Sequence, residues 1–200
     1  MTGRPLPLRL AVLASGGGSN LQAILDHFEK AGDERAASVV LVAANRPGAG
    51  ALDRARTAHI PVAIIADPAD GAALVRLLDS HRVECIALAG YLKLVPPEVT
   101  GRWRGRIVNI HPALLPKFGG AGMYGHRVHE AVLAAGETES GATVHHVDNV
   151  YDRGTIIAQE TVPVERGDTA DTLAARVLAA EHRLYPRALD ALAIQLITSR

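Results

Sequence analysis

Short apolar runs alternate with amphipathic segments along the first half of the chain. Five runs are largely apolar and are bounded by glycine, proline, asparagine or arginine, at 8–14, 39–44, 62–65, 85–89 and 107–110. Runs of this length and apolar content are typical of strands that are buried on both faces of a parallel sheet. The pattern therefore predicts five such strands.

Helical patterns lie between these runs. Leu21, Ile24, Leu25 and Phe28 keep the spacing i, i+3, i+4, i+7, which places them on one face of a helix. Weaker helical patterns cover 53–59 and 72–81. Strands that alternate with helices predict an α/β fold with a Rossmann-like, mostly parallel twisted sheet and helices on both faces.

The pattern changes after residue 110. A glycine-rich stretch at 118–125 precedes a helical pattern with Val128 and Val132 on its apolar face, and strands are predicted at 142–147, 155–158 and 161–164, some of them antiparallel. A long helix is expected from about Thr169, capped by Asp168 or Thr169. Pro186 should end or kink it near Tyr185. The composition does not shift along the chain, which predicts one domain over 1–200.

The composition is that of a globular protein, with 48% apolar and 21% charged residues. Lys and Arg number 21 and Asp and Glu number 21, so the chain lacks the positive charge that nucleic acids or anionic membranes would attract. A single cysteine, Cys85, excludes an intramolecular disulfide and fits the cytoplasm. No apolar run is long enough to cross a bilayer. Arg9 interrupts the apolar stretch after Arg4, and a glycine turn follows, so we interpret the stretch as a strand rather than a signal peptide.

The first glycine turn reads Ser-Gly-Gly-Gly-Ser-Asn at 15–20, between the first strand and the first helix. Ser19 and Gln22 have the spacing of a capping box. Free N–H groups at a helix start suit a phosphate. The turn lacks the third glycine of a dinucleotide site and the lysine of a P-loop, so a monophosphate fits best, with Gly18, Ser19 and Asn20 as donors. A tight turn without any ligand is the alternative.

Asn109 and His111 point to the same side of the strand at 107–110. They stand at its carboxyl end, where open α/β sheets bind ligands. An amide can donate to a developing oxyanion and an imidazole can move a proton near neutral pH. The pair therefore suits acyl transfer through a tetrahedral intermediate; the alternative is that both side chains only satisfy turn backbone. Asp152, two residues before Gly154, could orient His111 and raise its pKa, but the residues alone favour an aspartate in an ordinary turn.

The nine histidines raise the question of a metal. His126 and His129 lie three apart on a predicted helix, away from the valine stripe, and are expected on a solvated face. His145 and His146 alternate across a strand, so only one of them can face a given site. With one cysteine and no regular ligand spacing, no metal is expected.

Several motifs together resemble the phosphoribosylglycinamide formyltransferases, a family of folate-dependent enzymes of purine biosynthesis. They lie at 15–24, 88–93, 109–117, 141–145 and 152–154, in family order over nearly the whole chain. The resemblance implies transfer of the formyl group of 10-formyltetrahydrofolate, as co-substrate, to the amine of glycinamide ribonucleotide. It implies small-molecule partners rather than nucleic acid or membrane, and leaves a homodimer open.

The resemblance also implies roles for single residues. Asn109 would hold the formyl oxygen as it becomes anionic, His111 would manage the protons, and Asp152 would keep the imidazole oriented and more basic. Glu181 matches a family position that contacts the substrate ribose. The implied phosphate ligands are Gly18, Ser19 and Asn20. The implied folate contacts, mostly through backbone atoms, are Tyr91, Leu92, Lys93, Leu94, Val95, Asn109, Asn149 and Val150.

The chain departs from the family pattern in four places. The segment 62–85 is short, and 66–74 contains no arginine to meet the folate tail. Leu178 stands where a polar residue on the phosphate side is common. The stretch 118–125 carries four glycines in place of a shorter Pro-Gly turn, and we expect it to order over bound substrate as a lid.

Three other functions compete with this interpretation of the sequence. A 10-formyltetrahydrofolate deformylase would use the same three residues with water in place of the amine, and is expected to carry an extra N-terminal domain. A methionyl-tRNA formyltransferase would need an RNA-binding domain and a basic surface, against the zero net charge. A phosphate-binding α/β module would need none of Asn109, His111 and Asp152.

Overall fold

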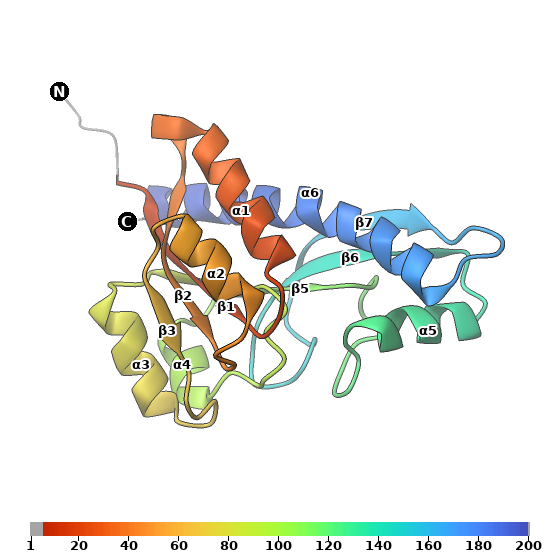
Figure 1. The fold of residues 1–200 in the computed structure, drawn as a ribbon, viewed down its shortest axis with the longest axis horizontal. Coiled ribbons are helices and arrows are strands. Elements are labelled where there is room, and N and C mark those ends of the chain that lie inside the picture. Colours follow the sequence, from red (N-terminus) through yellow and green to blue (C-terminus); the bar gives the residue numbers. More distant parts are fainter. Residues whose placement is uncertain (1–5, 200) are drawn as a thin grey trace.

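The computed structural model describes residues 6–199, and a seven-stranded sheet runs through them (Figure 1). The strand order is β3-β2-β1-β4-β5-β6-β7. Neighbours from β3 to β5 are parallel, and β6 and β7 are antiparallel to their neighbours. The strands are β1 (Leu8–Ala14), β2 (Ala37–Ala44), β3 (Val62–Ile64), β4 (Cys85–Leu88), β5 (Ile107–His111), β6 (Glu139–His146) and β7 (Ile156–Pro163). This confirms the predicted fold class; of the N-terminal stretch, Arg4 lies outside the described residues.

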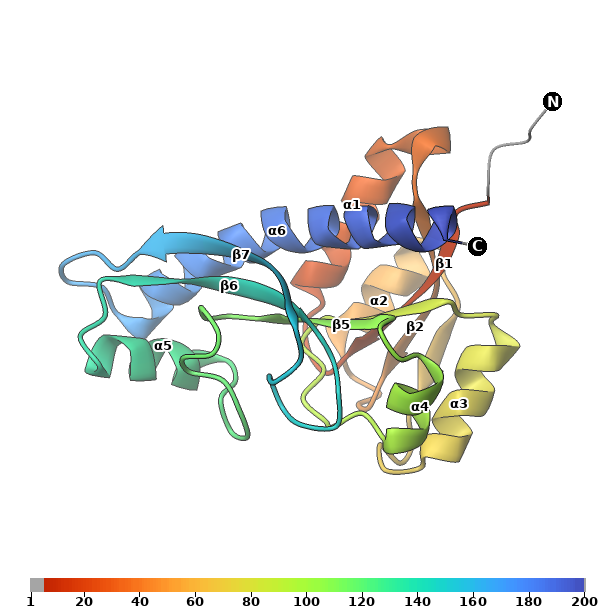
Figure 2. The same cartoon turned by 180° about the vertical axis from the view of Figure 1, so that it is seen from behind.

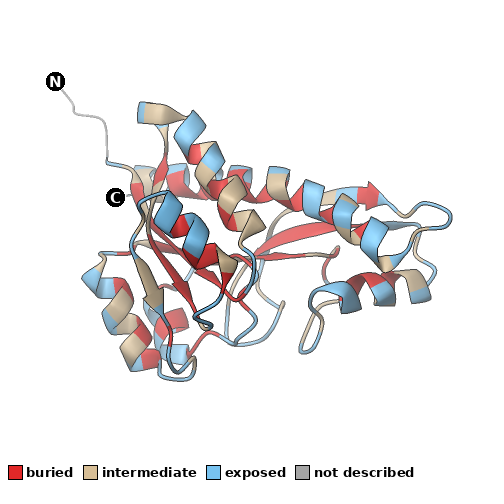
Figure 3. Ribbon diagram, viewed as in Figure 1, coloured by how far each residue is buried: buried red, intermediate tan, exposed pale blue. Residues whose placement is uncertain are grey.

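Helices cover both faces of the sheet (Figures 1 and 2). They are α1 (Ser19–Lys30), a 3₁₀ turn (Gly32–Glu34), α2 (Gly50–Thr57), α3 (Gly71–Ser80), α4 (Pro97–Arg102), α5 (His126–Ala134) and α6 (Ala170–Thr198). Leu10 and Val12 pack with α1, α2 and α6, whereas Ala11 and Leu13 pack with α3 and α4. Because successive side chains of a strand point to opposite faces, the apolar residues 10–14 of β1 supply both cores. Figure 3 shows the resulting buried layer in red along the sheet.

The long helix α6 is fixed to the sheet by Tyr185. This side chain is fully buried, and its hydroxyl lies 3.0 Å from the carbonyl oxygens of both Leu88, the last residue of β4, and Val108, the second residue of β5. Thr169 caps the helix through a capping box with Thr172, as one of the two predicted caps. Pro186 was expected to end or kink the helix near Tyr185; it does not end the helix, because α6 continues to Thr198. Pro186 is buried, so the packing around it opposes the loss of one backbone hydrogen bond.

Three other predictions of elements need correction. The separate strands at 155–158 and 161–164 are one continuous strand, β7, paired along its length with β6. The helix predicted at 53–59 begins earlier, at Gly50. The short helix α4 was not predicted; it begins on Pro97, a residue suited to a first helical turn.

The glycine turn begins α1 differently from the predicted capping box. The residue before the helix is Gly18, with φ 77°, and no side chain caps the helix start. Ser19 is already the first helical residue, and the Gln22 side chain donates to Asp26. A Cβ on Gly18 would lie 2.6 Å from the Ala51 Cα. Both the left-handed backbone and the close approach of α2 therefore require glycine here.

Candidate active site

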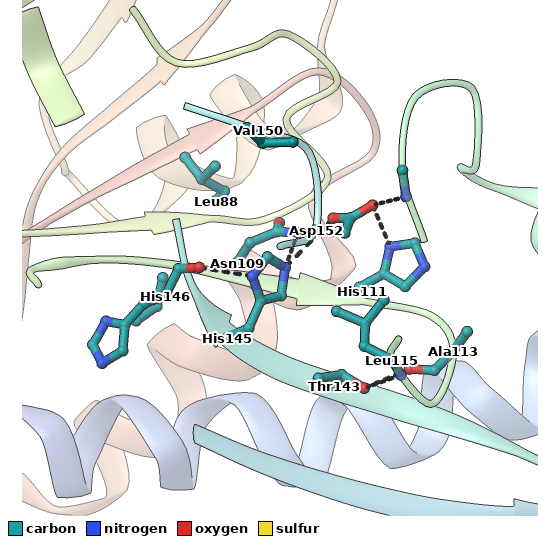
Figure 4. A network of polar contacts seen from close by, with 12 residues as sticks. Leu88, Asn109, His111, Ala113, Leu115, Thr143, His145, His146, Val150 and Asp152 are labelled. Carbon is teal, nitrogen blue, oxygen red and sulfur yellow. Dashed lines mark hydrogen bonds and ion pairs between the residues drawn. The ribbon is translucent and has the colours of Figure 1, made fainter. Parts of the chain in front are cut away.

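A cavity of about 550 Å³ opens at the carboxyl end of β5. The loop after β4, the glycine-rich loop 118–125, the turn before β7 and α6 contribute to its walls. Asn109, His111 and Asp152 all line it. The sequence separates Asp152 from the other two by about forty residues, and the fold brings the three side chains together (Figure 4).

The carboxylate of Asp152 meets His111 and the glycine-rich loop at the same time. Its Oδ2 lies 3.5 Å from Nδ1 of His111 and accepts a hydrogen bond of 2.9 Å from the amide of Gly120. The other ring nitrogen of His111, Nε2, lies 2.8 Å from the carbonyl oxygen of Phe118. A carbonyl only accepts, so Nε2 carries a hydrogen, and in the neutral ring the lone pair on Nδ1 faces Asp152.

Burial and charge act in opposite directions on this pair. Burial lowers the pKa of His111, while Asp152 and the Phe118 carbonyl partly oppose that shift. Burial alone would raise the pKa of Asp152. The contacts with His145, His111 and the Gly120 amide outweigh burial and leave the pKa below its usual range. The geometry thus holds a neutral imidazole beside a carboxylate anion at neutral pH. A proton that arrived at Nδ1 would lie between the two groups.

The turn that carries Asp152 is held against β6 by Gly154. A Cβ on Gly154 would overlap the carbonyl oxygen of His146, so only glycine allows the chain to pass this close. Asp152 itself has φ 55°, a conformation that aspartate tolerates better than most residues. The sequence pointed to Asp152 and Gly154 as residues of a turn. It could not show the close packing that directs this turn toward β5, because that packing depends on how β6 pairs in the sheet.

His145 is a site residue that the sequence did not single out. It is 2% exposed. Its Nε2 lies 3.1 Å from Nδ2 of Asn109 and 3.5 Å from Oδ1 of Asp152, and its Nδ1 lies 2.8 Å from the His146 carbonyl oxygen. Strand alternation allowed only one of His145 and His146 to face a given site. The antiparallel register, which sets Asn109 opposite His145, decides which one.

The far end of the cavity holds Glu181 and Asn20. Nδ2 of Asn20 donates a hydrogen bond of 2.7 Å to Oε2 of Glu181. Leu178 lines the same end. Of the other predicted phosphate ligands, Gly18 packs on Ala51 and Ser19 borders a separate groove between α1 and α6. The structure thus brings Asn20 and Glu181 together and leaves the Ser19 side chain outside the cavity.

The residues predicted to bind folate form one wall, with one exception. Tyr91, Leu92, Lys93, Leu94, Val95, Asn109 and Val150 line the cavity. Asn149 does not, because its side-chain oxygen accepts a hydrogen bond from the hydroxyl of Thr100 on α4. Leu92 and Leu94 are each 41% exposed, so the wall offers apolar surface to a flat ring.

The sequence model of one protein family, described as formyl transferase, matches residues 8–189. The chain belongs to the formyl transferase family. A chloroplastic phosphoribosylglycinamide formyltransferase of Arabidopsis thaliana is 44% identical over 94% of this chain. The solved structure of a glycinamide ribonucleotide transformylase from Symbiobacterium toebii is 37% identical, with a TM-score of 0.87, and covers 98% of this chain and 94% of its own.

The proteins that this chain resembles differ in length and in the reaction that they are named for. The chain spans 66% of the Arabidopsis protein and only 14% of a trifunctional purine biosynthetic protein of Drosophila pseudoobscura, to which it is 44% identical over 92% of its own length. A formyltetrahydrofolate deformylase structure from Pseudomonas syringae is more distant, at 25% identity and a TM-score of 0.84 over 95% of this chain and 62% of its own.

The histidines of α5 in this formyl transferase correct a further expectation. His126 is exposed and pairs with Asp171 on α6. His129 is 4% exposed and lines the cavity, contrary to the predicted solvated face. Burial, with the nearby His126 and His111, lowers its pKa to about 4. Within residues 6–199 no group of three or more His, Cys, Asp or Glu side chains is placed to hold a metal ion.

Glu181 predicts a pH dependence of stability. It is 7% exposed, and burial raises its pKa from 4.5 to about 7 in spite of the Asn20 hydrogen bond. A raised folded-state pKa gives stability that is present below the unfolded pKa and lost as pH rises through the folded pKa. We therefore expect the free energy of unfolding to fall by on the order of 3 kcal/mol between pH 5 and pH 8 because of this carboxyl group.

Urea unfolding of Glu181→Gln at these two pH values tests this expectation. The variant should lose much less stability than the parent protein between pH 5 and 8, because an amide does not titrate. The exposed Glu29→Gln is the control and should follow the parent. Equal pH dependence in Glu181→Gln and the parent would contradict the expectation.

Proposed function

We propose that this protein transfers the formyl group of 10-formyltetrahydrofolate to the amine of 5′-phosphoribosylglycinamide, a step of purine biosynthesis. The observation that carries the proposal is the convergence of Asn109, His111 and Asp152 in one cavity that also reaches Asn20 and Glu181. Relatives that bear the names of this activity, at 37% and 44% identity over nearly the whole chain, support it.

In this proposal Asn109 stabilises the tetrahedral intermediate. The amine nitrogen attacks the formyl carbon, and the formyl oxygen becomes an anion. An N–H of Asn109 that does not face His145 is free to donate to that oxygen. Such a donor, fixed before the reaction, stabilises developing charge more in a half-buried site than in water.

His111 and Asp152 handle the proton that the amine must lose. Nδ1 of His111 offers its lone pair in the space beside Asp152, so the proton can pass from the amine to Nδ1. The carboxylate then stabilises the imidazolium. The same proton goes to the folate nitrogen as its bond to the formyl carbon breaks, which returns His111 to its neutral form and balances the reaction.

Folate absorbance, followed with and without glycinamide ribonucleotide, tests the proposed function. Turnover that depends on the ribonucleotide supports the transferase. Turnover without it indicates the deformylase reaction, and no turnover under either condition indicates a binding module. Either of the last two results would contradict the proposal.

The phosphate-binding part of the proposal rests on the start of α1. We expect Ser19→Ala combined with Asn20→Ala to raise the KM for the ribonucleotide by about tenfold or more, chiefly through Asn20, which lines the cavity, since hydrogen bonds to a charged group are worth roughly 1.5–3 kcal/mol. The KM for the folate should stay within about threefold, a difference under 1 kcal/mol. Steady-state kinetics with each substrate varied in turn separates the two effects. A loss confined to the folate would place the phosphate elsewhere.

The glycine-rich loop is proposed to close over bound substrate. Phe118 and Gly120 hold its start on the His111–Asp152 pair, while Ala121 and Gly122 are exposed. We expect both substrates together to slow protease cleavage within 121–124. Cleavage at an unchanged rate under saturation would contradict a lid.

Other properties of the protein also belong to the proposal. We propose one formyltransferase domain over 1–200, small-molecule partners rather than nucleic acid or membrane, and a place in the cytoplasm, with a homodimer as the assembly to test by sedimentation. In residues 6–199, none of the helices combines the length and hydropathy that a bilayer crossing requires.

A further inference from the structure

His145 is not part of the predicted proton pair, His111 and Asp152, and it is not the predicted oxyanion donor, Asn109. Its side chain nevertheless contacts Asp152 and Asn109. It is among the most deeply buried polar residues of the site, at 2% exposed. In Figure 4 the same nitrogen of its ring faces both Asn109 and Asp152, and the neighbouring His146 ring points away from them. A buried ring with hydrogen-bond partners at both nitrogens has a defined tautomer.

The backbone determines that tautomer. Nδ1 of His145 lies 2.8 Å from the carbonyl oxygen of His146. Since this oxygen can only accept, Nδ1 carries the hydrogen. In the neutral ring, Nε2 then has a lone pair and no hydrogen, and it can only accept.

The lone pair on Nε2 determines in turn how the Asn109 amide is oriented. An asparagine side chain has nearly the same shape after a half-turn that exchanges its oxygen and nitrogen. Nε2 of His145 lies 3.1 Å from the Asn109 side chain, and a neutral acceptor there favours the NH₂ group over the oxygen. One N–H bonds to His145, and the second stays available to a ligand.

We propose that His145 is a positioning residue, which holds the Asn109 amide with its nitrogen toward the reacting formyl group. This inference rests on the proposed function and deepens it. Without His145 the amide could turn its oxygen toward the developing oxyanion, where two partial negative charges would repel each other. The effect acts on the transition state rather than on binding of either substrate.

The carboxylate of Asp152 is the competing partner of the same nitrogen. Its Oδ1 lies 3.5 Å from Nε2, which is longer than the Asn109 contact and long for a hydrogen bond. Only a ring with a hydrogen on Nε2 could donate to Asp152. The titratable groups near this ring are Asp152, His111 and His146. A doubly protonated His145 would form an ion pair with Asp152 and leave Asn109 unpositioned.

A series of substitutions separates positioning from packing. His145→Phe keeps the ring volume and removes the acceptor, and we expect kcat to fall about 30-fold, below the loss of an oxyanion donor itself. Both KM values should stay within about threefold. His145→Gln returns an acceptor near the Nε2 position and should recover at least half of the lost activation free energy. His146→Gln, whose ring points away from the site, is the matched control and should keep the parent kcat.

A double-mutant cycle with Asn109→Ala gives the decisive kinetic result. If His145 acts through Asn109, then adding His145→Phe to the Asn109→Ala variant should lower kcat by less than about a further threefold. Equal losses in both backgrounds would overturn the inference, as would a glutamine variant no better than the phenylalanine variant. A parent protein without amine-dependent formyl transfer would instead overturn the proposed function.

Nitrogen NMR of the parent protein tests the tautomer without any turnover. At about pH 7.5 we expect Nδ1 of His145 to be protonated and Nε2 to be the bare nitrogen. This measurement needs no variant to fold. A hydrogen on Nε2, alone or with one on Nδ1, would overturn the inference even if the protein is an active transferase.

Discussion

Asp152→Asn should lower kcat by at least about 100-fold, the usual scale for loss of an acid–base partner. The substitution keeps the shape of the side chain, and its oxygen can still accept from Gly120. It removes the negative charge that lies 3.5 Å from Nδ1 of His111. An imidazolium would then form without a counter-charge in a buried place, which raises the barrier to proton transfer.

Thermal unfolding and steady-state kinetics of this variant are to be measured together. The melting temperature and both KM values should stay close to those of the parent protein. Asp53→Asn, on the exposed surface of α2, is the matched control and should keep full activity. Near-parent turnover in Asp152→Asn would remove this carboxylate from the mechanism.

The second large effect is expected from Gly154→Ala. A single methyl group at this position would overlap the carbonyl oxygen of His146, and a backbone carbonyl cannot move aside without disturbing β6. We expect a loss of about 2 kcal/mol or more in the free energy of unfolding, as overpacking in other proteins costs. The turn should also shift Asp152 away from His111, so kcat falls as well.

Gly48→Ala is the control for this change. Gly48 is exposed, and a Cβ there would meet no atom within 4 Å. Urea unfolding should show parent stability for Gly48→Ala and a lower midpoint for Gly154→Ala. A parent-like midpoint with parent-like kcat in Gly154→Ala would show that the turn is not held as the structure has it.

The sequence predicted the fold class because its signals are local. A largely apolar run such as Leu8–Ala14, interrupted only by Arg9, is typical of a strand buried on both faces, and it is β1. The expected end of the helix at Pro186 rested on a local signal as well, the free-energy cost of a proline inside a helix. The packing that keeps α6 continuous comes from distant elements of the chain. The join of two predicted strands into β7 has the same origin, since pairing with β6 extends it.

The active site was only partly predictable for a related reason. Asn109 and His111 stand on one strand, so their common side follows from strand geometry. The residues alone left Asp152 in an ordinary turn, and the family resemblance supplied its role. His145 depends on the antiparallel register between β5 and β6, which no local pattern encodes. The exposure of His129 was predicted wrongly. The buried face of α5 includes His129 beside the two valines, and the cavity extends to it.

The hydrogen bonds between Tyr185 and the sheet affect which formyl acceptors can fit the cavity. Glu181 lies one helical turn before Tyr185 on α6, and the Tyr185 hydroxyl reaches the carbonyl of Val108, the residue next to Asn109. The carboxylate at one end of the cavity and the amide at the other are therefore joined by a rigid spacer. An amine on an arm longer or shorter than this spacer would miss the formyl carbon while its sugar is held. For the proposed formyl transfer, this spacer therefore predicts that the acceptor is selected partly by its length.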